Sequence, residues 1–345
     1  MKKIVILAID AFDYMESKTG NMLLRYSPED VIAIIDPSKT GKTAQSVIGY
    51  GGDIPVISTF QDSLKFNPDS LVIGNAPQGG RINKAYRSEI NDAIRANCDI
   101  YSGMHTFLND DEAFKNLSIE NDISLFDLRK PSETRHFPKG LWQERKVPVM
   151  LIVGTDCDTG KMTTAWEIKL RLESSGKKVA FLGTGQTGIL LSGNGVPIDA
   201  VVSDFMAGEI EHCIEEISSG MDLVIIEGQG AISNYAYSGV TLGLLHGAMP
   251  DFMIMTHNPG RKHDVLNYPL PDIESMIKLH LDLMKPFKLS RFLGINLLTH
   301  LLDEASATSL IQEYTQTYHL PVTDLVRFGS GDLINHIEEA LEQWN

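Results

Sequence analysis

Residues Pro148 to Thr164 read PVMLIVGTDCDTGKMTT, and they indicate the architecture of the second half of the chain. An apolar run ends at Gly154, and a helical pattern begins at Lys161. The residues between them predict a strand-to-helix turn, where backbone N–H groups and the positive end of the helix dipole converge. Gly154 and Gly160 let the main chain approach phosphate oxygens, and Lys161 supplies a cation to the outer phosphates. This stretch therefore predicts a phosphate-binding loop.

The loop departs from the common form in two ways. The common form places four residues between its glycines and Ser or Thr after the lysine. Here Thr155 to Thr159 stand between the glycines, and Met162 follows Lys161. The missing hydroxyl normally binds the Mg²⁺ of a nucleoside triphosphate, and a thioether is a poor ligand for so hard an ion. Thr163 or Thr164 could replace it only in a shifted register. We expect phosphate binding, with a ligand-free glycine-rich turn as the alternative, and ATP hydrolysis is disfavoured.

The rest of the chain alternates short β-branched runs with longer helical patterns, which indicates parallel sheets covered by helices on both faces. At 345 residues, the chain exceeds what one core usually organises. The stretch from Arg129 to Pro148 carries three prolines and weak periodicity, which favours a linker. We therefore predict two α/β domains, residues 1–140 and 141–345.

The expected elements follow the apolar runs. Strands are expected at Ile4–Ile9, Asp30–Ile35, Ser70–Gly74, Asp99–Ser102, Ile123–Asp127, Pro148–Gly154, Lys177–Gly185, Asp222–Gly228, Asp251–His257, Arg291–Leu298 and Leu320–Val326. A helix is expected at Lys161–Ser174, while residues 183–188 and 239–247 are interpreted as glycine-rich turns.

Composition excludes several classes of protein. The formal net charge of −15 makes nucleic acid or an anionic membrane an unlikely partner, because either would be repelled. Cys98, Cys157 and Cys213 are too few and too scattered for a disulfide framework. No run reaches the roughly 18 apolar residues of a membrane helix, and no histidine pair has zinc-site spacing. We expect a cytoplasmic protein without a bound metal.

Several further side chains are candidates for chemistry. Glu227 ends the run LVIIEGQG, where its carboxylate would point at the loop from a neighbouring strand; an exposed strand-end glutamate is the alternative. His246, His257, Arg261 and Asp251 lie close together in the sequence. A lone histidine is more often structural, but together these residues could supply a base for an amine and a guanidinium for a carboxylate.

In the first domain, the turn after the first strand lacks GxGxxG, so a dinucleotide there has little support. Asp36 follows the second strand and is interpreted as a turn former. Arg81, in IGNAPQGGRI, and His105, in SGMHTFL, are expected to line a cleft and to contact the substrate. In the second domain, residues 258–271 are long for a connector and are expected to cover a site.

The loop resembles the variant loop of dethiobiotin synthetase and its relatives, which also opens with GTD. Much more of the chain resembles the family of D-glutamate N-acetyltransferases. The motifs that carry this resemblance are IGNAPQGGRI, SGMHTFL, GTDCDTGKMTTA, IEGQGA, LLHGAMPD, THNPGR and VTDLVRFG. The resemblance implies an N-terminal Rossmann-like parallel sheet and a C-terminal P-loop NTPase-like doubly wound parallel sheet. It also implies transfer of acetyl from acetyl-CoA to the amine of D-glutamate.

Coenzyme A explains the unusual loop, because it has a diphosphate and a 3′-phosphate but no γ-phosphate to cleave. Under the resemblance the cofactor phosphates are held by Gly154, Thr155, Asp156, Gly160, Lys161, Thr163 and Thr164, and Asn296 contacts the base. The acceptor amine must lose a proton before it attacks the thioester. Glu227 and His246 are the candidates for that base, while Arg261 or Arg81 would pair with the substrate carboxylates.

Two other functions stay open at this point. One is an ATP-dependent ligase or kinase that binds ATP with Mg²⁺, suggested by the dethiobiotin-synthetase-like loop. The other is a non-catalytic nucleotide-binding module, suggested by the missing Mg²⁺ hydroxyl. In each case the partner is a small molecule, and a homo-oligomer is the common arrangement for such proteins.

Overall fold

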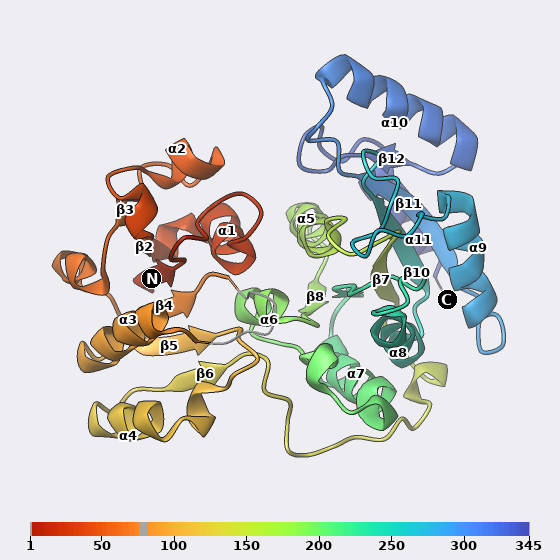
Figure 1. The fold of residues 1–345 in the computed structure, drawn as a ribbon. Coiled ribbons are helices and arrows are strands. Elements are labelled where there is room, and N and C mark those ends of the chain that lie inside the picture. The colour runs from red at the N-terminus through yellow and green to blue at the C-terminus, as the bar shows by residue number, and fades with distance from the viewer. Residues whose placement is uncertain (1, 76–81, 345) are drawn as a thin grey trace. The chain divides into compact units, whose positions relative to one another are not determined.

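The computed structural model describes residues 2–75 and 82–344. The chain divides into two compact units, Met1–Lys130 and Pro131–Asn345. Each unit is built on a six-stranded sheet whose strands pair in parallel (Figure 1). The predicted α/β fold with two parallel sheets is therefore confirmed. In the described part of the chain, the helices are too short or too polar to cross a membrane.

The N-terminal unit has the strand order β3-β2-β1-β4-β5-β6, which is the order of the Rossmann fold. Its strands are β1 (Ile4–Leu7), β2 (Val31–Ile35), β3 (Val56–Ile57), β4 (Ser70–Ile73), β5 (Asp99–Ser102) and β6 (Leu125–Asp127). Its helices are α1 (Lys18–Tyr26), α2 (Ala44–Ile48), α3 (Lys84–Arg95) and α4 (Glu112–Glu120), with 3₁₀ turns at Pro28–Asp30, Pro37–Lys39, Phe60–Phe66 and Leu108–Asp110.

Asp36, at the end of β2, holds the turns of this unit together. Its buried carboxylate accepts the backbone N–H of Phe12 (3.2 Å) and of Ser38 (3.0 Å) and the ammonium of Lys39 (3.0 Å). Burial alone would raise the pKa of Asp36, but the hydrogen bonds from Ser38 and Lys39 lower it below its usual value. Asp36 is thus a turn former, as its position after the strand predicts.

The C-terminal unit has the strand order β12-β11-β10-β7-β9-β8. Its strands are β7 (Val149–Gly154), β8 (Val179–Leu182), β9 (Leu223–Ile226), β10 (Phe252–His257), β11 (Arg291–Leu297) and β12 (Val322–Thr323). Its helices are α5 (Lys161–Ser174), α6 (Gln186–Ser192), α7 (Ser203–Ser218), α8 (Ser238–Ala248), α9 (Ile273–Met284), α10 (Glu304–Tyr318) and α11 (Leu333–Glu342), with 3₁₀ turns at Leu141–Gln143 and Ile198–Ala200.

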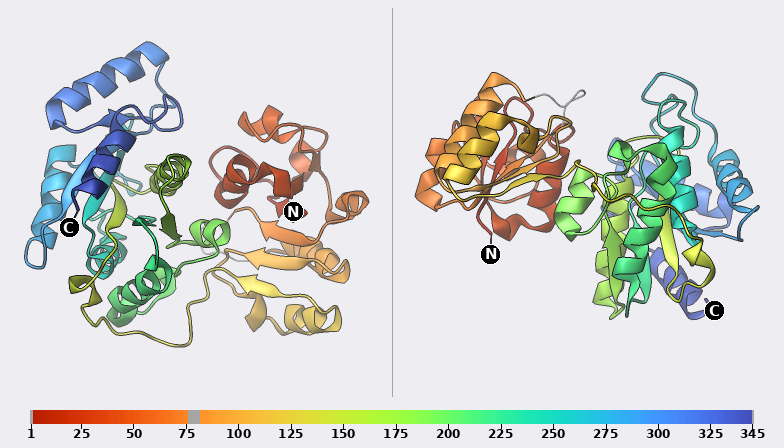
Figure 2. Two further views of the ribbon diagram at one scale, coloured as in Figure 1. Left: turned by 180° about the vertical axis from the view of Figure 1, so that it is seen from behind. Right: turned by 90° about the horizontal axis from the view of Figure 1, so that it is seen from below.

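Strand β7 is central in this sheet and is buried along its whole length. Leu151 and Val153 face a core that they share with α7, α8 and α9, whereas α5 and α11 contact each other and pack on the other face. A strand covered on both faces reads as a continuous apolar run, which is why VMLIV does not alternate. Figures 1 and 2 show these helices on both sides of the sheet.

The interpretation of residues 239–247 as a glycine-rich turn is wrong, because they lie inside α8. The glycines allow this helix to approach α7 closely. A Cβ on Gly243 would lie 2.8 Å from Met206 Sδ, and one on Gly247 would lie 2.8 Å from Ile210 Cβ. Gly243 and Gly247 are four residues apart and therefore share one helix face. Glycine here serves helix packing and not chain reversal.

The segment before β7 is tied to α7 by two buried glutamates. Glu209 accepts the backbone N–H of His136 (2.7 Å), and Glu211 accepts those of Lys139 (2.5 Å) and Leu141 (2.8 Å). Burying carboxylates is costly unless they are hydrogen-bonded, and these backbone donors satisfy them. The predicted linker is thus fixed along the C-terminal unit over part of its length.

Candidate functional site

The loop between β7 and α5 has the backbone of an anion cradle. A Cβ on Gly154 would lie 2.5 Å from Thr159 Oγ1 and 2.7 Å from Thr256 Oγ1, so no side chain fits there. Asp158 and Gly160 have φ angles of 55° and 85°, in the left-handed region. Alternation of right- and left-handed residues turns successive N–H groups toward one point and forms an anion-binding concavity. These φ angles are compatible with the predicted phosphate cradle, which stays a prediction.

Lys161 is the first residue of α5 and lies over this loop. It is 7% exposed, and its Nζ donates to the carbonyl oxygen of Asp156 at 2.6 Å. A Cβ on Gly228, in the loop after β9, would lie 3.0 Å from Lys161 Cδ. The same Cβ would lie 1.6 Å from the carbonyl oxygen of Ile152, so glycine is needed here first by strand β7 and then by the lysine stem. Lys161 Nζ also lies 3.5 Å from Thr159 Oγ1, so the ammonium is held at the loop by oxygens of the loop itself.

The two threonines after Met162 differ in their surroundings. Thr163 is partly exposed, whereas Thr164 is buried one helical turn beyond the loop. The Thr164 hydroxyl accepts a hydrogen bond from Asn296 Nδ2 at 2.8 Å, and Asn296 Oδ1 accepts the backbone N–H of Leu325 at 2.9 Å. Asn296 therefore ties α5 to β11 and to the segment after β12. It is 3% exposed, and both ends of its amide are used in these contacts.

Asp156 is the centre of a buried polar cluster at the loop. Its carboxylate is fully buried and accepts Arg261 Nη1 (3.1 Å), the backbone N–H of Val265 (3.0 Å) and Asn234 Nδ2 (3.4 Å). Arg261 Nη1 also donates to the carbonyl oxygen of Cys157 at 2.8 Å. The long segment 258–271 is thus anchored against the cradle, and part of the Arg261 guanidinium is bonded within the protein.

Asn234 extends this cluster to a second loop. Its Nδ2 donates to Asp264 Oδ2 at 3.2 Å, and its Oδ1 accepts the backbone N–H of Ala236 at 3.1 Å. Asn234 is 1% exposed, so its amide must find partners within the protein, as it does. We call Asp156, Arg261, Asn234 and Asp264 the clasp, because these residues join the P-loop to the loops after β9 and β10.

His257 ends β10 directly beside the loop. Its Nδ1 lies 2.9 Å from the hydroxyl oxygen of Thr155, and the ring is 9% exposed. Burial lowers the pKa of His257 to about 4, because a charged imidazolium would lose its hydration. The side chain is therefore neutral near pH 7 and is a hydrogen-bonding partner of the loop.

Glu227 follows β9, next to β7, and is 8% exposed. Its Oε2 accepts the backbone N–H of Thr184 at 3.1 Å and of Gly185 at 3.4 Å, in the turn before α6. Gln229 lies two residues further on, and its Oε1 is buried without a hydrogen-bond partner among the described residues. The run EGQG thus places the Glu227 carboxylate at the turn before α6, whereas Gln229 and Lys161 line the same small cavity.

The structure separates the expected cluster of His246, His257, Arg261 and Asp251. Asp251 immediately precedes β10, where it accepts the ammonium of Lys288 (2.6 Å), whereas His257 ends that strand. Six residues of strand span about 20 Å. His246 lies in the last turn of α8 at the amino edge of the sheet, packed edge-on against Phe287, and burial lowers its pKa. Nearness in sequence therefore did not bring His246 or Asp251 to the loop.

Of the two candidates in the N-terminal unit, His105 falls among the described residues. His105 lies in the loop after β5, at the carboxyl edge of its own sheet, and is exposed. Arg81 lies outside the described residues.

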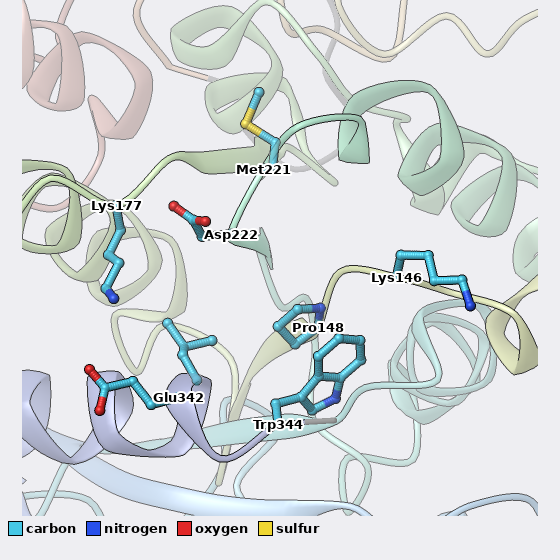
Figure 3. Close-up of a pocket in the computed structure, with 8 residues that line it drawn as sticks. Lys146, Pro148, Lys177, Met221, Asp222, Glu342 and Trp344 are labelled. Atoms are coloured by element: carbon cyan, nitrogen blue, oxygen red, sulfur yellow. The ribbon is translucent and has the colours of Figure 1, made fainter.

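A surface pocket of about 230 Å³ opens at the other edge of the C-terminal sheet (Figure 3). Figure 3 shows Pro148, Lys177, Asp222 and Trp344 around it. Pro148 precedes β7 and Asp222 precedes β9, so this pocket is at the amino ends of the strands. Ligands of open parallel sheets bind at the carboxyl ends. The loop between β7 and α5 is therefore the better candidate site.

Strand order and loop together define the C-terminal unit as a P-loop domain, joined to a Rossmann-like domain. Comparison with protein families agrees with this class. A family model described as "Domain of unknown function (DUF1611_C) P-loop domain" matches residues 136–334. A second, described as "Domain of unknown function (DUF1611_N) Rossmann-like domain", matches residues 37–131. The chain belongs to the DUF1611 family.

Individual proteins are similar over most of the chain. A protein of Tritonibacter scottomollicae named D-glutamate N-acetyltransferase is 32% identical over 330 residues, 94% of this chain and 95% of that protein. A protein of the same name from a Pseudoalteromonas species is 33% identical over 279 residues, covering 80% and 83%. The crystal structure of a DUF1611 family protein from Anabaena variabilis has a TM-score of 0.92 at 32% identity and covers 98% of this chain and 100% of that one.

Sequence reasoning missed Asn234, Asp264 and Gln229 as parts of the site. Gln229 stands inside the quoted run LVIIEGQG, but the pattern gave no reason to expect its oxygen to be buried. Asn234 and Asp264 carry no motif spacing, and only the fold brings them to Asp156. A signal for the clasp did exist in the unusual length of the segment 258–271.

Proposed function

We propose that this protein is an N-acetyltransferase that transfers the acetyl group of acetyl-CoA to the amine of D-glutamate. The observation that carries the proposal is a loop between β7 and α5 that keeps the glycines and the lysine of a P-loop, while the position after Lys161 holds Met162. The two relatives named D-glutamate N-acetyltransferase support the choice of reaction.

The loop favours coenzyme A over a nucleoside triphosphate. Mg²⁺ requires oxygen ligands, and the hydroxyl that normally follows the P-loop lysine is replaced by the thioether of Met162. Thr164 is one helical turn away, and its hydroxyl already accepts the amide of Asn296. The diphosphate of coenzyme A needs a cradle and a cation but no hydrolysis of a terminal phosphate. Gly154, Gly160 and Lys161 meet those needs.

The chemistry requires the amine to lose a proton and the thioester to lose its sulfur. The ammonium of D-glutamate gives a proton to a base, and the free nitrogen attacks the acetyl carbonyl carbon. The tetrahedral intermediate then breaks its C–S bond, and the base returns a proton to the thiolate of coenzyme A. The nitrogen loses its second proton to water as the amide forms. The products are N-acetyl-D-glutamate, the free thiol and one proton, so atoms and charge balance.

Glu227 is our choice for the base. Its carboxylate lies at the carboxyl end of β9, the strand beside β7, and the hydrogen bonds from Thr184 and Gly185 fix its orientation. His257 is the weaker choice, because its Nδ1 is used in the contact with the Thr155 hydroxyl within the loop, at 2.9 Å. Arg261 is 25% exposed at the rim of the loop and is our choice to pair with a substrate carboxylate.

Titration calorimetry with acetyl-CoA and, separately, with ATP and Mg²⁺ tests this proposal. We expect acetyl-CoA to bind and ATP with Mg²⁺ to bind much more weakly. If ATP with Mg²⁺ binds tightly and acetyl-CoA does not bind, the transferase is excluded. The ligase or kinase of the dethiobiotin-synthetase-like class then becomes the better account.

A further inference from the structure

A ligand on the P-loop can extend along the carboxyl edge of the sheet in two directions, and these differ in charge. Toward β9 it meets the carboxylate of Glu227 and the oxygen of Gln229, which has no hydrogen-bond partner in the described part of the chain. Toward β11 and β12 it meets Arg327, which follows β12. Glu227 would repel a phosphate on the β9 side, whereas Arg327 would attract one on the side of β11 and β12.

Arg327 is exposed, but its position is fixed by the protein. Its Nη1 donates to the carbonyl oxygens of Thr299 at 2.9 Å and of Leu302 at 2.8 Å. Its backbone N–H donates to Asp324 Oδ1 at 3.1 Å. These contacts use one guanidinium nitrogen, so a phosphate can reach the others from solvent. Guanidinium groups bind phosphate by a fork of parallel hydrogen bonds, which suits such a site.

The segment that holds Arg327 is connected to the P-loop. Asp324 is 5% exposed, and its Oδ2 accepts the backbone N–H (3.0 Å) and the hydroxyl (2.7 Å) of Thr299. The residue before Thr299 touches the cradle, because a Cβ on Gly160 would lie 2.8 Å from Leu298 Cδ1. Arg327 is therefore connected through Thr299 and Leu298 to the loop that would bind the diphosphate.

Exposed apolar side chains accompany this cation. Leu301 is 74% exposed, Val326 43% and Phe328 36%. The guanidinium carbon of Arg327 lies 5.0 Å from the centre of the Phe328 ring. A flat heterocycle such as adenine packs on apolar and aromatic surface of this kind. Apolar surface beside a fixed guanidinium is what an adenosine with an extra phosphate requires.

We propose that Arg327 binds the 3′-phosphate of coenzyme A. This inference rests on the proposed use of acetyl-CoA and deepens it, because it names the residue that selects coenzyme A. ATP and ADP lack a 3′-phosphate, so Arg327 distinguishes coenzyme A from them by a group outside the P-loop. The adenosine then lies toward β11 and β12, and the pantetheine arm extends toward β9 and Glu227.

The test compares coenzyme A with 3′-dephospho-coenzyme A, which differ only in that phosphate. Their dissociation constants are measured by calorimetry for the wild type, for Arg327→Gln and for Arg291→Gln. The last variant is the matched control, because it removes the same charge from an exposed arginine at the opposite end of β11.

For the wild type and the control we expect coenzyme A to bind roughly 10- to 100-fold more tightly than the dephospho form, the range for hydrogen bonds to charged groups. In Arg327→Gln we expect this ratio to fall close to one through weaker binding of coenzyme A alone. Equal affinities in the wild type, or a ratio that Arg327→Gln leaves unchanged, would overturn the inference.

A general loosening of the segment around Arg327 would weaken the binding of both ligands and leave the ratio of their dissociation constants unchanged. The same measurements therefore distinguish it from the loss of a contact with the 3′-phosphate. Failure of both ligands to bind the wild type would instead count against the proposed function. The two proposals can therefore fail separately.

Discussion

Lys161 is the residue on which the phosphate cradle depends most. Its ammonium lies at the loop, so Lys161→Ala should weaken acetyl-CoA by about 1.5 to 3 kcal/mol, the range for hydrogen bonds to charged groups. Calorimetry measures the loss, and circular dichroism checks the fold. Lys169→Ala is the matched control, because Lys169 lies on the same helix and pairs with Glu173. Unchanged affinity in Lys161→Ala would show that the loop is not the cradle.

His257 makes the stability of the C-terminal unit depend on pH. In the folded unit its pKa is about 4, below the ordinary 6.5. Between these two values the unfolded chain binds a proton at His257 and the folded unit does not. The contribution of the neutral His257 ring to the free energy of unfolding is fully present above about pH 6.5. It decreases as the pH falls toward the folded pKa and changes no further below it, with a total loss of up to about 3 kcal/mol.

This effect is measurable because the tryptophans, Trp142, Trp166 and Trp344, all belong to the C-terminal unit. Urea unfolding followed by their fluorescence at pH 7, 6 and 5 gives the free energy of unfolding of that unit. His257→Gln should show a smaller loss between pH 7 and 5 than the wild type. Parallel curves for the two proteins would contradict the assigned pKa.

At the scale of elements, the clasp holds the long segment 258–271 on the P-loop. Asp156→Ala leaves Arg261, Val265 and Asn234 without their shared acceptor, and it should cost about 2 to 4 kcal/mol of unfolding free energy. Hydrogen exchange in the segment should speed up markedly. Asp282→Ala is the control, because Asp282 pairs with Lys278 on the surface of α9. Equal exchange in Asp156→Ala and the wild type would mean that the clasp does not hold the segment.

The glycines of α8 give a second test within one helix. Gly247→Ala should destabilise by about 1 to 3 kcal/mol, because its Cβ would lie 2.9 Å from the Ala207 Cα on α7. Gly239→Ala meets nothing within 4 Å, and alanine there should stabilise by about 0.5 to 1 kcal/mol. Thermal unfolding compares the two variants. Similar melting temperatures would contradict the close packing of α7 and α8.

These elements also show what the sequence could predict. Helix α5 was predicted over Lys161–Ser174, as it is found, because a glycine loop and a helical period mark its ends. The core of each long strand was predicted by its apolar run, although β12 is only Val322–Thr323. Helix α8 was misread, because a glycine that admits a neighbouring helix looks in sequence like a glycine that turns the chain.

At the scale of the whole molecule, the predicted pair of parallel sheets is confirmed. Within the candidate site, the sequence could predict only the part formed by one contiguous stretch of residues. The P-loop is one contiguous stretch, so its spacing could be read directly. The contact of Asp156 with Arg261 spans 105 residues and depends on β10 lying beside β7. His246 and His257 are close in sequence, but in the fold His246 lies at the amino edge of the sheet and His257 at the carboxyl edge. Such pairings follow from strand order, which no local pattern contains.

The most direct measurement of the central claim is the release of free thiol from acetyl-CoA in the presence of D-glutamate, with the product identified by its mass. We predict one equivalent of thiol for each N-acetyl-D-glutamate formed, without ATP. A panel of other D- and L-amino acids defines the acceptor. Absence of thiol release with D-glutamate and with every member of the panel would contradict the account.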